Sequence, residues 1–532
     1  MDEPGTTQQL RSGLVLLGLC LAAYVINLDI TIVNVALPTL VRETRATTTD
    51  LQWVVDAYSL VFAALVLVMG SLSDRFGRKG TLLAGLGVFA VASLAGSLCS
   101  TVNQLIAARA VMGVGAAMIF PSTLSLISNI FVERGQRARA IGLWGATAGV
   151  GIATGPIIGG WLLEHFWWGS IFVFLVPVAI VVGALVAFVV PPSRDPRRRP
   201  IDWRGFVLSS AGMGLLVFGV IEAPDWGWSS TSTLLAIAGG AVLLAAFILV
   251  ERRTEEPMLD VELFKNPRFT AASGSVTIAF FALSGFIFLT TQYFQFVKAF
   301  TPFGAGVRLL PVAASVAIGS VGGTKLAVRV GNKVIVACGL LLFCAGLLWV
   351  STASANTSYG IIALQMVLIG GGMGLTSAPA TEAVMGAVPK EKAGVGSAVN
   401  DATRLFGATL GVAVIGSVAA SLYVSRLGST IPPGLPTRAT AAAKGSVGGA
   451  IVASHVLDRL GFVRPAVHLR DAAIGAFMHS LAGGCQVAGG VAFAGAILAA
   501  TLLPARPRRT VDPESDALNS PERSLIEVET PT

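Results

Sequence analysis

Fourteen apolar runs dominate the pattern of residues along this 532-residue chain. Each run is about twenty residues long, the length at which an α-helix crosses a bilayer, and none shows polar/apolar alternation. The pattern therefore predicts an all-α integral membrane protein with fourteen transmembrane helices. The expected spans lie near 14–37, 51–72, 81–100, 104–128, 139–162, 169–190, 205–223, 232–250, 271–297, 305–325, 334–352, 358–384, 394–421 and 474–503.

The composition agrees with a membrane protein. Hydrophobic residues make up 54% of the chain and charged residues 12%, with a mean hydropathy of +0.76. A soluble protein carries about twice that share of charged residues. The net charge of +8 does not indicate nucleic acid binding, because the cations lie in short loops between apolar runs. The first run is too long for the core of a signal peptide and is expected to be the first span.

The loop charges predict the orientation in the cell membrane. An even number of spans places both termini on one side, and cytoplasmic loops carry an excess of Lys and Arg. The loops on the side of the termini hold "SRDPRRRP" and Arg75, Arg78, Lys79, Arg134, Arg137, Arg139, Arg252, Arg253, Lys265, Arg268, Lys325, Arg329, Lys333, Lys390 and Lys392. The opposite loops hold only Arg42, Arg45, Lys298 and Arg308. Both termini are therefore expected in the cytoplasm.

An internal repeat suggests duplicated halves. "LSDRFGRK" at 72–79 aligns with "LAVRVGNK" at 326–333, so that Gly77 matches Gly331, while Val328 replaces Asp74. Duplicated halves are typical of secondary transporters. The offset of 331 − 77 = 254 residues spans eight helices. Two six-helix halves with two inserted helices are therefore expected.

This repeat predicts the domain organisation. The expected parts are a cytoplasmic N-terminus at 1–13, a six-helix bundle at 14–190, a linker with two additional transmembrane helices at 191–270, a second six-helix bundle at 271–503 and a cytoplasmic tail at 504–532. The stretch 422–473 is expected as an outer loop, with one short amphipathic helix in "AIVASHVLDRLGFV". The tail is acidic and contains Pro and Ser, which predicts disorder.

Several motifs resemble those of the major facilitator superfamily. "GSLSDRFGRKG" (70–80) resembles its signature loop, and "LDITIVNVALPTL" (28–40) resembles the first-span motif of its fourteen-span drug:proton antiporters. "LIAARAVMGVGAAMIFPSTLSLI" (105–127) and "GVGIATGPIIGGWL" (149–162) resemble the fourth-span motif and the fifth-span antiport motif. "LQWVVDAYSL" and "GSAVNDATRLFGATLGVAV" resemble exporters of quaternary ammonium compounds.

The resemblance implies proton-coupled export of lipophilic, cationic drugs, antiseptics or dyes. The two halves would rock around a site near mid-membrane, with the proton gradient as the energy source and no cofactor. A dedicated exporter of one antibiotic or other natural product would carry the same motifs. An uptake symporter is disfavoured by the fifth-span motif, and a non-transporting protein by the charges inside the spans.

The signature loop has the candidate residues Gly70, Asp74, Arg75, Gly77, Arg78 and Lys79. Gly77 permits a sharp turn. Asp74 can cap a neighbouring helix or pair with Arg75 or Arg78. The resemblance implies a latch that holds the outward-open state; the alternative is a charge cluster that only sets topology.

The fifth-span motif places Gly151, Gly155 and Gly159 on one helix face, where another helix can approach closely. Pro156, next to this face, removes one backbone hydrogen bond. With Gly160 these residues predict a tightly packed helix that can seal a pathway. The alternative is ordinary close packing.

Charged residues inside spans are the candidates for proton coupling. A charge at mid-bilayer costs at least about 2.5–3.5 kcal/mol. Asp29, Asp56 and Arg109 lie inside the first, second and fourth spans. We expect Asp29 and Asp56 to exchange protons with drug, with Arg109 tuning them. The alternatives are a static Asp29–Arg109 ion pair and an Asp56 in the headgroup zone.

Further candidates for a substrate cavity come from the second half, where aromatic faces and a few polar groups suit planar cations. These are Asp401, Glu382, Phe281, Phe286, Gln292 and Gln295. A local ion pair with Arg404 is the alternative for Asp401, and a position facing the cytosol is the alternative for Glu382. Part of the aromatic run can instead belong to a lipid-facing belt.

The sequence shows no pattern of catalytic or metal-ligating residues. The four His and five Cys residues have no metal-ligand spacing, and no nucleophile–base arrangement or nucleotide-binding loop is present. An enzyme is therefore not expected. The expected partners are lipophilic small molecules, protons and the bilayer, with neither a nucleic acid nor an obligate protein partner.

Overall fold

The computed structural model describes residues 4–194, 202–255, 257–388 and 393–504. Within these ranges it is built of helices without strands, and fourteen helices are long and apolar enough to cross a membrane. The prediction of an all-α fold with fourteen spans is confirmed. Residues 1–3, 195–201, Lys390, Lys392 and the tail from 505 onward lie outside the described residues.

Six helices form the first half of the bundle. They are α1 (Pro4–Thr44), α2 (Thr48–Phe76), α3 (Arg78–Ser97), α4 (Val102–Ile130), α5 (Arg134–His165) and α6 (Ser170–Val189). Helix α1 packs against α5 and α6, and α2 and α3 both pack against α4. Thr47 and Thr101 begin α2 and α4 with capping boxes that satisfy the first backbone N–H groups.

The second half repeats this arrangement. Its helices are α9 (Pro267–Gln292), α10 (Pro302–Arg308), α11 (Leu310–Val330), α12 (Asn332–Val350), α13 (Tyr359–Ala387), α14 (Ala393–Thr430) and α17 (Val463–Leu502). Helix α9 packs against α14 and α17, and α11 and α12 both pack against α13. The tenth expected span is divided into α10 and α11, and the ninth ends in the π-helical turn η2 (Tyr293–Val297).

The predicted repeat is visible in two matching turns. Gly77 joins α2 to α3 with φ of 119°, and Gly331 joins α11 to α12 with φ of 92°. Each glycine N–H donates to the carbonyl four residues back, at 3.0 Å to Ser73 and 2.8 Å to Ala327. A positive φ favours glycine because it has no Cβ. Both turns therefore depend on the same residue type for the same reason.

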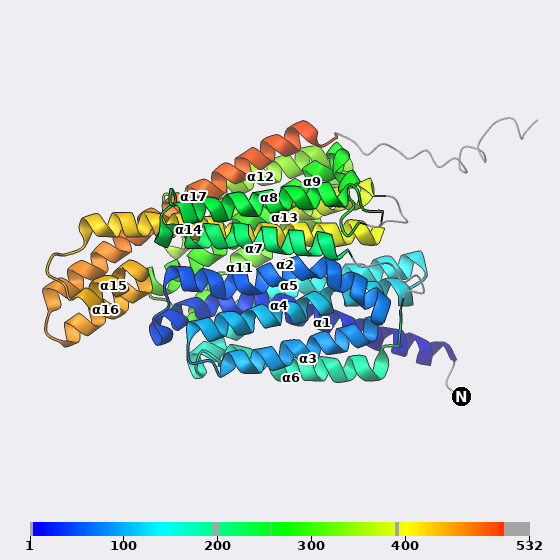
Figure 1. The fold of residues 1–532 in the computed structure, drawn as a ribbon, viewed down its shortest axis with the longest axis horizontal. Helices are drawn as coiled ribbons and strands as arrows, with labels where there is room; N and C mark the ends of the chain where they lie inside the picture. Colours follow the sequence, from blue (N-terminus) through cyan, green and yellow to red (C-terminus); the bar gives the residue numbers. More distant parts are fainter. Residues whose placement is uncertain (1–3, 195–201, 256, 389–392, 505–532) are drawn as a thin grey trace, which may run out of the picture.

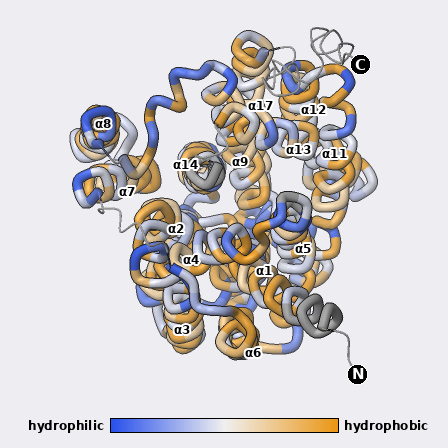
Figure 2. The backbone as a smooth tube through the Cα atoms, turned by 90° about the vertical axis from the view of Figure 1, so that its right-hand side faces the viewer, coloured by the Kyte–Doolittle hydropathy of each residue, from blue (hydrophilic) through white to orange (hydrophobic). Residues whose placement is uncertain are grey.

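The inserted helices α7 (Trp203–Trp226) and α8 (Thr231–Glu251) form a hairpin at one edge of the bundle, followed by a short turn η1 (Val261–Lys265). Figure 2 looks along the helices and shows α7 beside α2 and α14, one helix from each half. The indole N–H of Trp53 on α2 donates to Glu222 at 2.8 Å, and that of Trp228 donates to Ser421 on α14 at 2.9 Å. The hairpin therefore contacts both halves.

The stretch 422–473 differs from the expected outer loop because most of it is helical. Helix α14 continues to Thr430, α15 covers Thr437–Gly445, α16 covers Val447–Arg459, and α17 begins at Val463. The expected short helix corresponds to α16. Pro432, Pro433, Gly434 and Pro436 lie in the break between α14 and α15, and the Ala-rich sequence that follows has a high helix propensity.

The two ends of the bundle are distinct in Figure 1. Helices α15 and α16 project from one end, here termed the α15 end, while the described chain begins and ends at the opposite end, here termed the terminal end. The Gly77 and Gly331 turns lie at the terminal end, because α1 starts there and successive spans reverse direction.

Glycines bring α5 into direct contact with α1. A Cβ at Gly151 would lie 2.7 Å from the Cβ of Asn27, and one at Gly159 would lie 2.6 Å from the side chain of Ile32. A Cβ at Gly155 would collide with Thr31. The three glycines share one helix face, and this face docks on α1.

This packing predicts that leucine on α5 destabilises the protein at Gly155 but not at Gly149. Gly155→Leu should lower the yield of monodisperse protein and the unfolding temperature in detergent, because overpacking costs about 1–3 kcal/mol or more. Gly149→Leu is the matched control, since a Cβ at Gly149 meets nothing within 4 Å. Equal behaviour of the two variants in thermal unfolding would contradict the α1–α5 contact.

Candidate functional site

A buried ion pair joins α1 to α4. Arg109 is 1% exposed and Asp29 is fully buried. The Nη1 atom of Arg109 donates to both carboxylate oxygens of Asp29, at 2.9 and 2.7 Å. Its Nε donates to the carbonyl of Val54 at 3.1 Å, and its Cζ lies 4.3 Å from the ring centroid of Tyr58. The guanidinium of this α4 residue is therefore held by groups from α1 and α2, and the Asp29–Arg109 ion pair considered from the sequence is present.

Asp56 lacks such a partner. Its side chain is fully buried, and neither carboxylate oxygen accepts a hydrogen bond from any described residue. An ionised carboxylate in a low-dielectric interior is costly without compensation. Asp56 is therefore a buried acidic group that the described residues leave without compensation.

Asp56 lies one helical turn from a contact between the two halves. Gln52 is four residues earlier on α2, on the same face. Its Nε2 atom donates to the carbonyls of Val412 and Ala413 at 3.2 and 3.0 Å and to the hydroxyl of Ser417 at 3.1 Å. All three acceptors belong to α14. A rearrangement of this contact would therefore change the surroundings of Asp56.

Other contacts between the halves lie at the same end of the bundle. Gln295 donates through Nε2 to the carbonyl of Val35 at 2.9 Å. Glu164, near the end of α5, accepts from the backbone N–H of Phe303 at 3.2 Å. Among the described residues, the side-chain hydrogen bonds between the halves all lie toward the α15 end. The two halves are therefore closed against each other at this end.

The Gly-Pro motif contributes to that closure. Gly306 of α10 lies against the carbonyl of Pro156, where no Cβ would fit. A Cβ at Gly160 would lie 2.5 Å from the Cα of Phe303. One face of α5 therefore docks on α1 within the first half, and a neighbouring face docks on α10 of the second half. The sealing role expected for this motif remains a prediction, and the contact it needs is present.

The signature loop lies at the terminal end and is bound within its own half. Arg78 donates through Nε to Asp74 at 2.6 Å, which is one of the pairings expected for this aspartate. The backbone N–H of Arg78 donates to the carbonyl of Ser193 at 2.8 Å, and Lys79 Nζ donates to the carbonyl of Ala187 at 2.7 Å. Gly70 approaches Pro121 of α4, and Arg75 lies over Phe76. The role as a latch remains a prediction.

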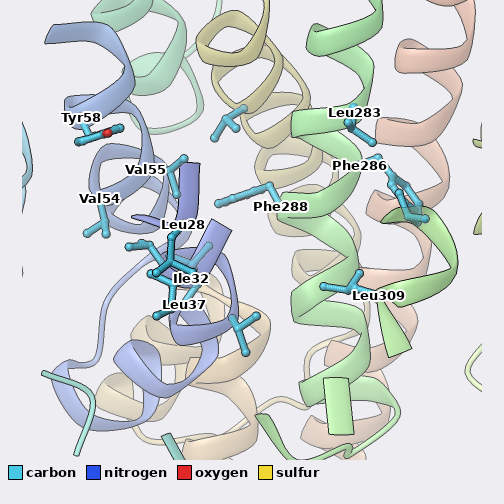
Figure 3. Close-up of a cluster of buried hydrophobic side chains, with 14 of the residues drawn as sticks. Leu28, Ile32, Leu37, Val54, Val55, Tyr58, Leu283, Phe286, Phe288 and Leu309 are labelled. Carbon is cyan, nitrogen blue, oxygen red and sulfur yellow. The ribbon is translucent and has the colours of Figure 1, made fainter. Parts of the chain in front are cut away.

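The aromatic candidates on α9 are buried, and a neighbouring residue is better placed. Phe281 and Phe286 are 9% and 2% exposed. In Figure 3, Phe288 points from α9 toward the helices of the first half, whereas Phe286 points to the opposite side. Phe280 is half-buried, and its ring centroid lies 4.6 Å from the guanidinium carbon of Arg404. The aromatic ring that lies beside a polar group is therefore Phe280, next to Arg404. Phe280 was not among the residues expected from the sequence.

The remaining candidates of the second half do not form one cluster. Asp401 is buried, with its Oδ1 atom 3.7 Å from Nη1 of Arg404, so the local ion pair is present. Glu382 is exposed, whereas Asp401 is buried. Gln292 is buried and donates to the carbonyl of Phe288 on its own helix. A cavity role for these residues remains a prediction.

The sequence matches the Major Facilitator Superfamily over residues 19–412. The chain belongs to this superfamily. Among relatives, it is 37% identical to the multidrug resistance protein Stp of Mycobacterium tuberculosis over 79% of this chain and 78% of that protein. It is 36% identical to the multidrug efflux pump LfrA of Mycolicibacterium smegmatis over 90% and 94% of the two chains. It is 34% identical to the methylenomycin A resistance protein of Streptomyces coelicolor over 78% and 87%.

The fold is also similar to a solved structure of the superfamily. A bacterial homologue of the lysosomal transporter Spinster, in an inward-facing and occupied conformation, superposes with a TM-score of 0.65 at 15% identity. The alignment covers 92% of this chain and 96% of the homologue. The major facilitator fold is therefore shown by sequence and by structure, with α7 and α8 inserted between its halves.

The Asp29–Arg109 geometry predicts a large and partly rescuable loss of stability. Arg109→Leu should lower the unfolding temperature in detergent strongly, because removing one partner of a buried ion pair costs about 3–5 kcal/mol. The double variant Asp29→Asn with Arg109→Leu should recover part of that loss. Thermal unfolding of the wild type, both single variants and the double variant gives the interaction energy between the Asp29 and Arg109 side chains. Additive effects would contradict the pairing.

The contacts between the halves predict a shift in conformation. Replacing Gln52 and Gln295 by Leu removes their hydrogen bonds to the other half, so the α15 end should open more often. Spin labels at the exposed positions Glu43 and Asn356, one in each half, would report this as a longer distance in pulsed EPR. The control replaces Gln104, which bonds only near its own helix start. An unchanged distance distribution would contradict the proposed closure.

Proposed function

We propose that this protein exports lipophilic, cationic drugs across the cell membrane in exchange for protons. The names of two relatives state multidrug resistance or efflux, and a third relative is an antibiotic resistance protein. The observation that carries the proposal is Asp56, a buried carboxylate without a hydrogen-bond donor among the described residues, one turn from a contact between the halves. A protein with only a structural role has little use for such a group.

The exchange follows from the chemistry of Asp56. Its carboxylate is stabilised either by a bound organic cation or by a proton, and the two compete for one site. With both termini in the cytoplasm, as the loop charges favour, the structure is closed toward the outside and corresponds to an inward-facing state. Drug would bind from this side and displace the proton. Opening at the α15 end would expose the site to the outside, where a proton would displace drug.

The Asp29–Arg109 pair has a different part in this proposal. Its charges compensate each other, so it has less need of an external cation than Asp56 has. We assign it the role of positioning α1 and α4 next to α2, with Val54 and Tyr58 as its α2 contacts. Phe280 beside Arg404 offers an aromatic face on the second half for a planar substrate. Transport by this route requires no cofactor and no chemical change of the substrate.

A dedicated exporter of one antibiotic is the second candidate. It is favoured by the relative whose name specifies a single compound, methylenomycin A. Both candidates use the same carboxylate and the same rocking motion. They differ only in the range of compounds that drive proton release, so a panel of compounds separates them.

Transport can be measured in inside-out vesicles with an acidic lumen and an internal pH-sensitive dye. Ethidium or another quaternary cation should cause alkalinisation of the lumen by the wild-type protein. Asp56→Asn should abolish this signal, because the amide cannot exchange a proton. Asp458→Asn, at an exposed position on α16, is the matched control and should retain it.

Three results would contradict parts of the proposal. Drug uptake without a pH change would exclude proton exchange. An unaltered signal in Asp56→Asn would exclude this residue as the coupling group. No response to any lipophilic cation from folded protein, but a response to one antibiotic, would favour the dedicated exporter.

A further inference from the structure

A groove runs along the outer surface of the second half. It lies between α11 and α12, with α13 as its floor, and encloses about 600 Å³. Its lining is largely apolar, with Ile318 and Gly322 from α11, Leu342 from α12 and Leu368 from α13. Helices α11 and α12 are joined at Gly331 but pack mainly against α13 rather than against each other. The groove is the space left between them.

The groove lies on the perimeter of the bundle. Figure 2 shows α11, α12 and α13 together at one edge of the second half, with α11 next to α5 of the first half. Ile318, on its wall, is 74% exposed, and Val328 of the same helix is 80% exposed. Exposed apolar side chains on a membrane span face lipid. The groove is therefore separate from the site that contains Asp56.

Two cations line the terminal end of the groove. Lys325 and Arg329 are exposed, and the structure shows no ion pair or hydrogen bond for either side chain among the described residues. In the first half Asp74 pairs with Arg78, but both members of this pair are replaced in the second half, by Val328 and Asn332. Arg329 matches Arg75, whereas Lys325 matches Ser71 and is a cation that the first half lacks at this position. The sequence around the Gly331 turn, residues 324–333, contains no carboxylate that could pair with Lys325 or Arg329.

We propose that this α11–α12 groove binds an anionic phospholipid, with the phosphate between Lys325 and Arg329 and an acyl chain along the apolar walls. The 14 residue-to-residue steps from Ser315 to Arg329 rise about 21 Å along the helix. Half of a bilayer, including its headgroups, measures about 20–22 Å. The groove therefore has the length of one leaflet, and its volume is in the range of small-molecule sites, about 300–1,000 Å³.

The charge at the groove mouth selects the class of occupant. Arg presents a fork of donors that suits a phosphate, and Lys adds a second positive charge. A cationic drug would be repelled by this pair. A zwitterionic lipid would fill the same groove without a net charge to match it. An anionic lipid satisfies both the apolar walls and the two cations.

Native mass spectrometry of the full-length protein in detergent tests the site. Phosphatidylglycerol and phosphatidylcholine with the same acyl chains are titrated separately onto delipidated protein. We expect at least tenfold tighter binding of the first phosphatidylglycerol, since cations near the membrane surface contribute to anionic lipid binding. Lys325→Gln with Arg329→Gln should remove this preference. Arg252→Gln with Arg253→Gln, two exposed cations before η1, should keep it.

A second variant tests the apolar part of the groove. A Cβ at Gly322 meets nothing within 4 Å, so Gly322→Leu fills the groove without disturbing helix packing. It should weaken the binding of both lipids. Equal binding of the two lipids by the wild type, or an unchanged preference after removal of Lys325 and Arg329, would overturn the proposal. If Gly322→Leu binds both lipids as tightly as the wild type does, the groove is not the site of the acyl chain.

Discussion

Every polar group inside a membrane span has to find its partner within the protein, and this constraint organises the molecule. For the backbone it is met by helices, which satisfy their own N–H and C=O groups. For side chains it is met at helix contacts, as in the bidentate Asp29–Arg109 pair and the bonds from Gln52 to α14. At Asp56 the constraint is not met, because neither carboxylate oxygen has a hydrogen-bond donor among the described residues, and the proposed exchange rests on this group.

The contacts that close the two halves against each other are few and weak enough to be broken. It consists of glycine contacts, such as Gly306 on the Pro156 carbonyl, and of a few hydrogen bonds from side chains such as Gln52 and Gln295. A typical intramolecular hydrogen bond contributes only about 0.5–1.5 kcal/mol net. A closure built from a few such bonds is compatible with rocking of the halves, whereas the more extensive packing inside each half favours movement as a unit.

The two halves share an architecture but not their surface chemistry. The Gly77 and Gly331 turns have the same backbone geometry, yet only the first carries a carboxylate that pairs with its arginine. The first turn is held by its own ion pair and by Ser193, while the second leaves Lys325 and Arg329 facing the membrane. The hairpin of α7 and α8 adds a further asymmetry, because it contacts α2 and α14 and so covers one edge between the halves.

The sequence by itself determined the fourteen spans, the helical class and the matching glycine turns, because hydrophobic length, glycine chemistry and repeats are local properties. It also indicated Asp29, Asp56 and Arg109, since a charge inside an apolar run stands out on its own. Only the tertiary structure decided which groups meet: the α14 acceptors of Gln52, the pairing of Trp53 with Glu222, the choice of Phe280 over Phe281 beside Arg404, and the α11–α12 groove. These depend on the rotation and separation of helices that are far apart in the chain, and hydropathy carries no information about either.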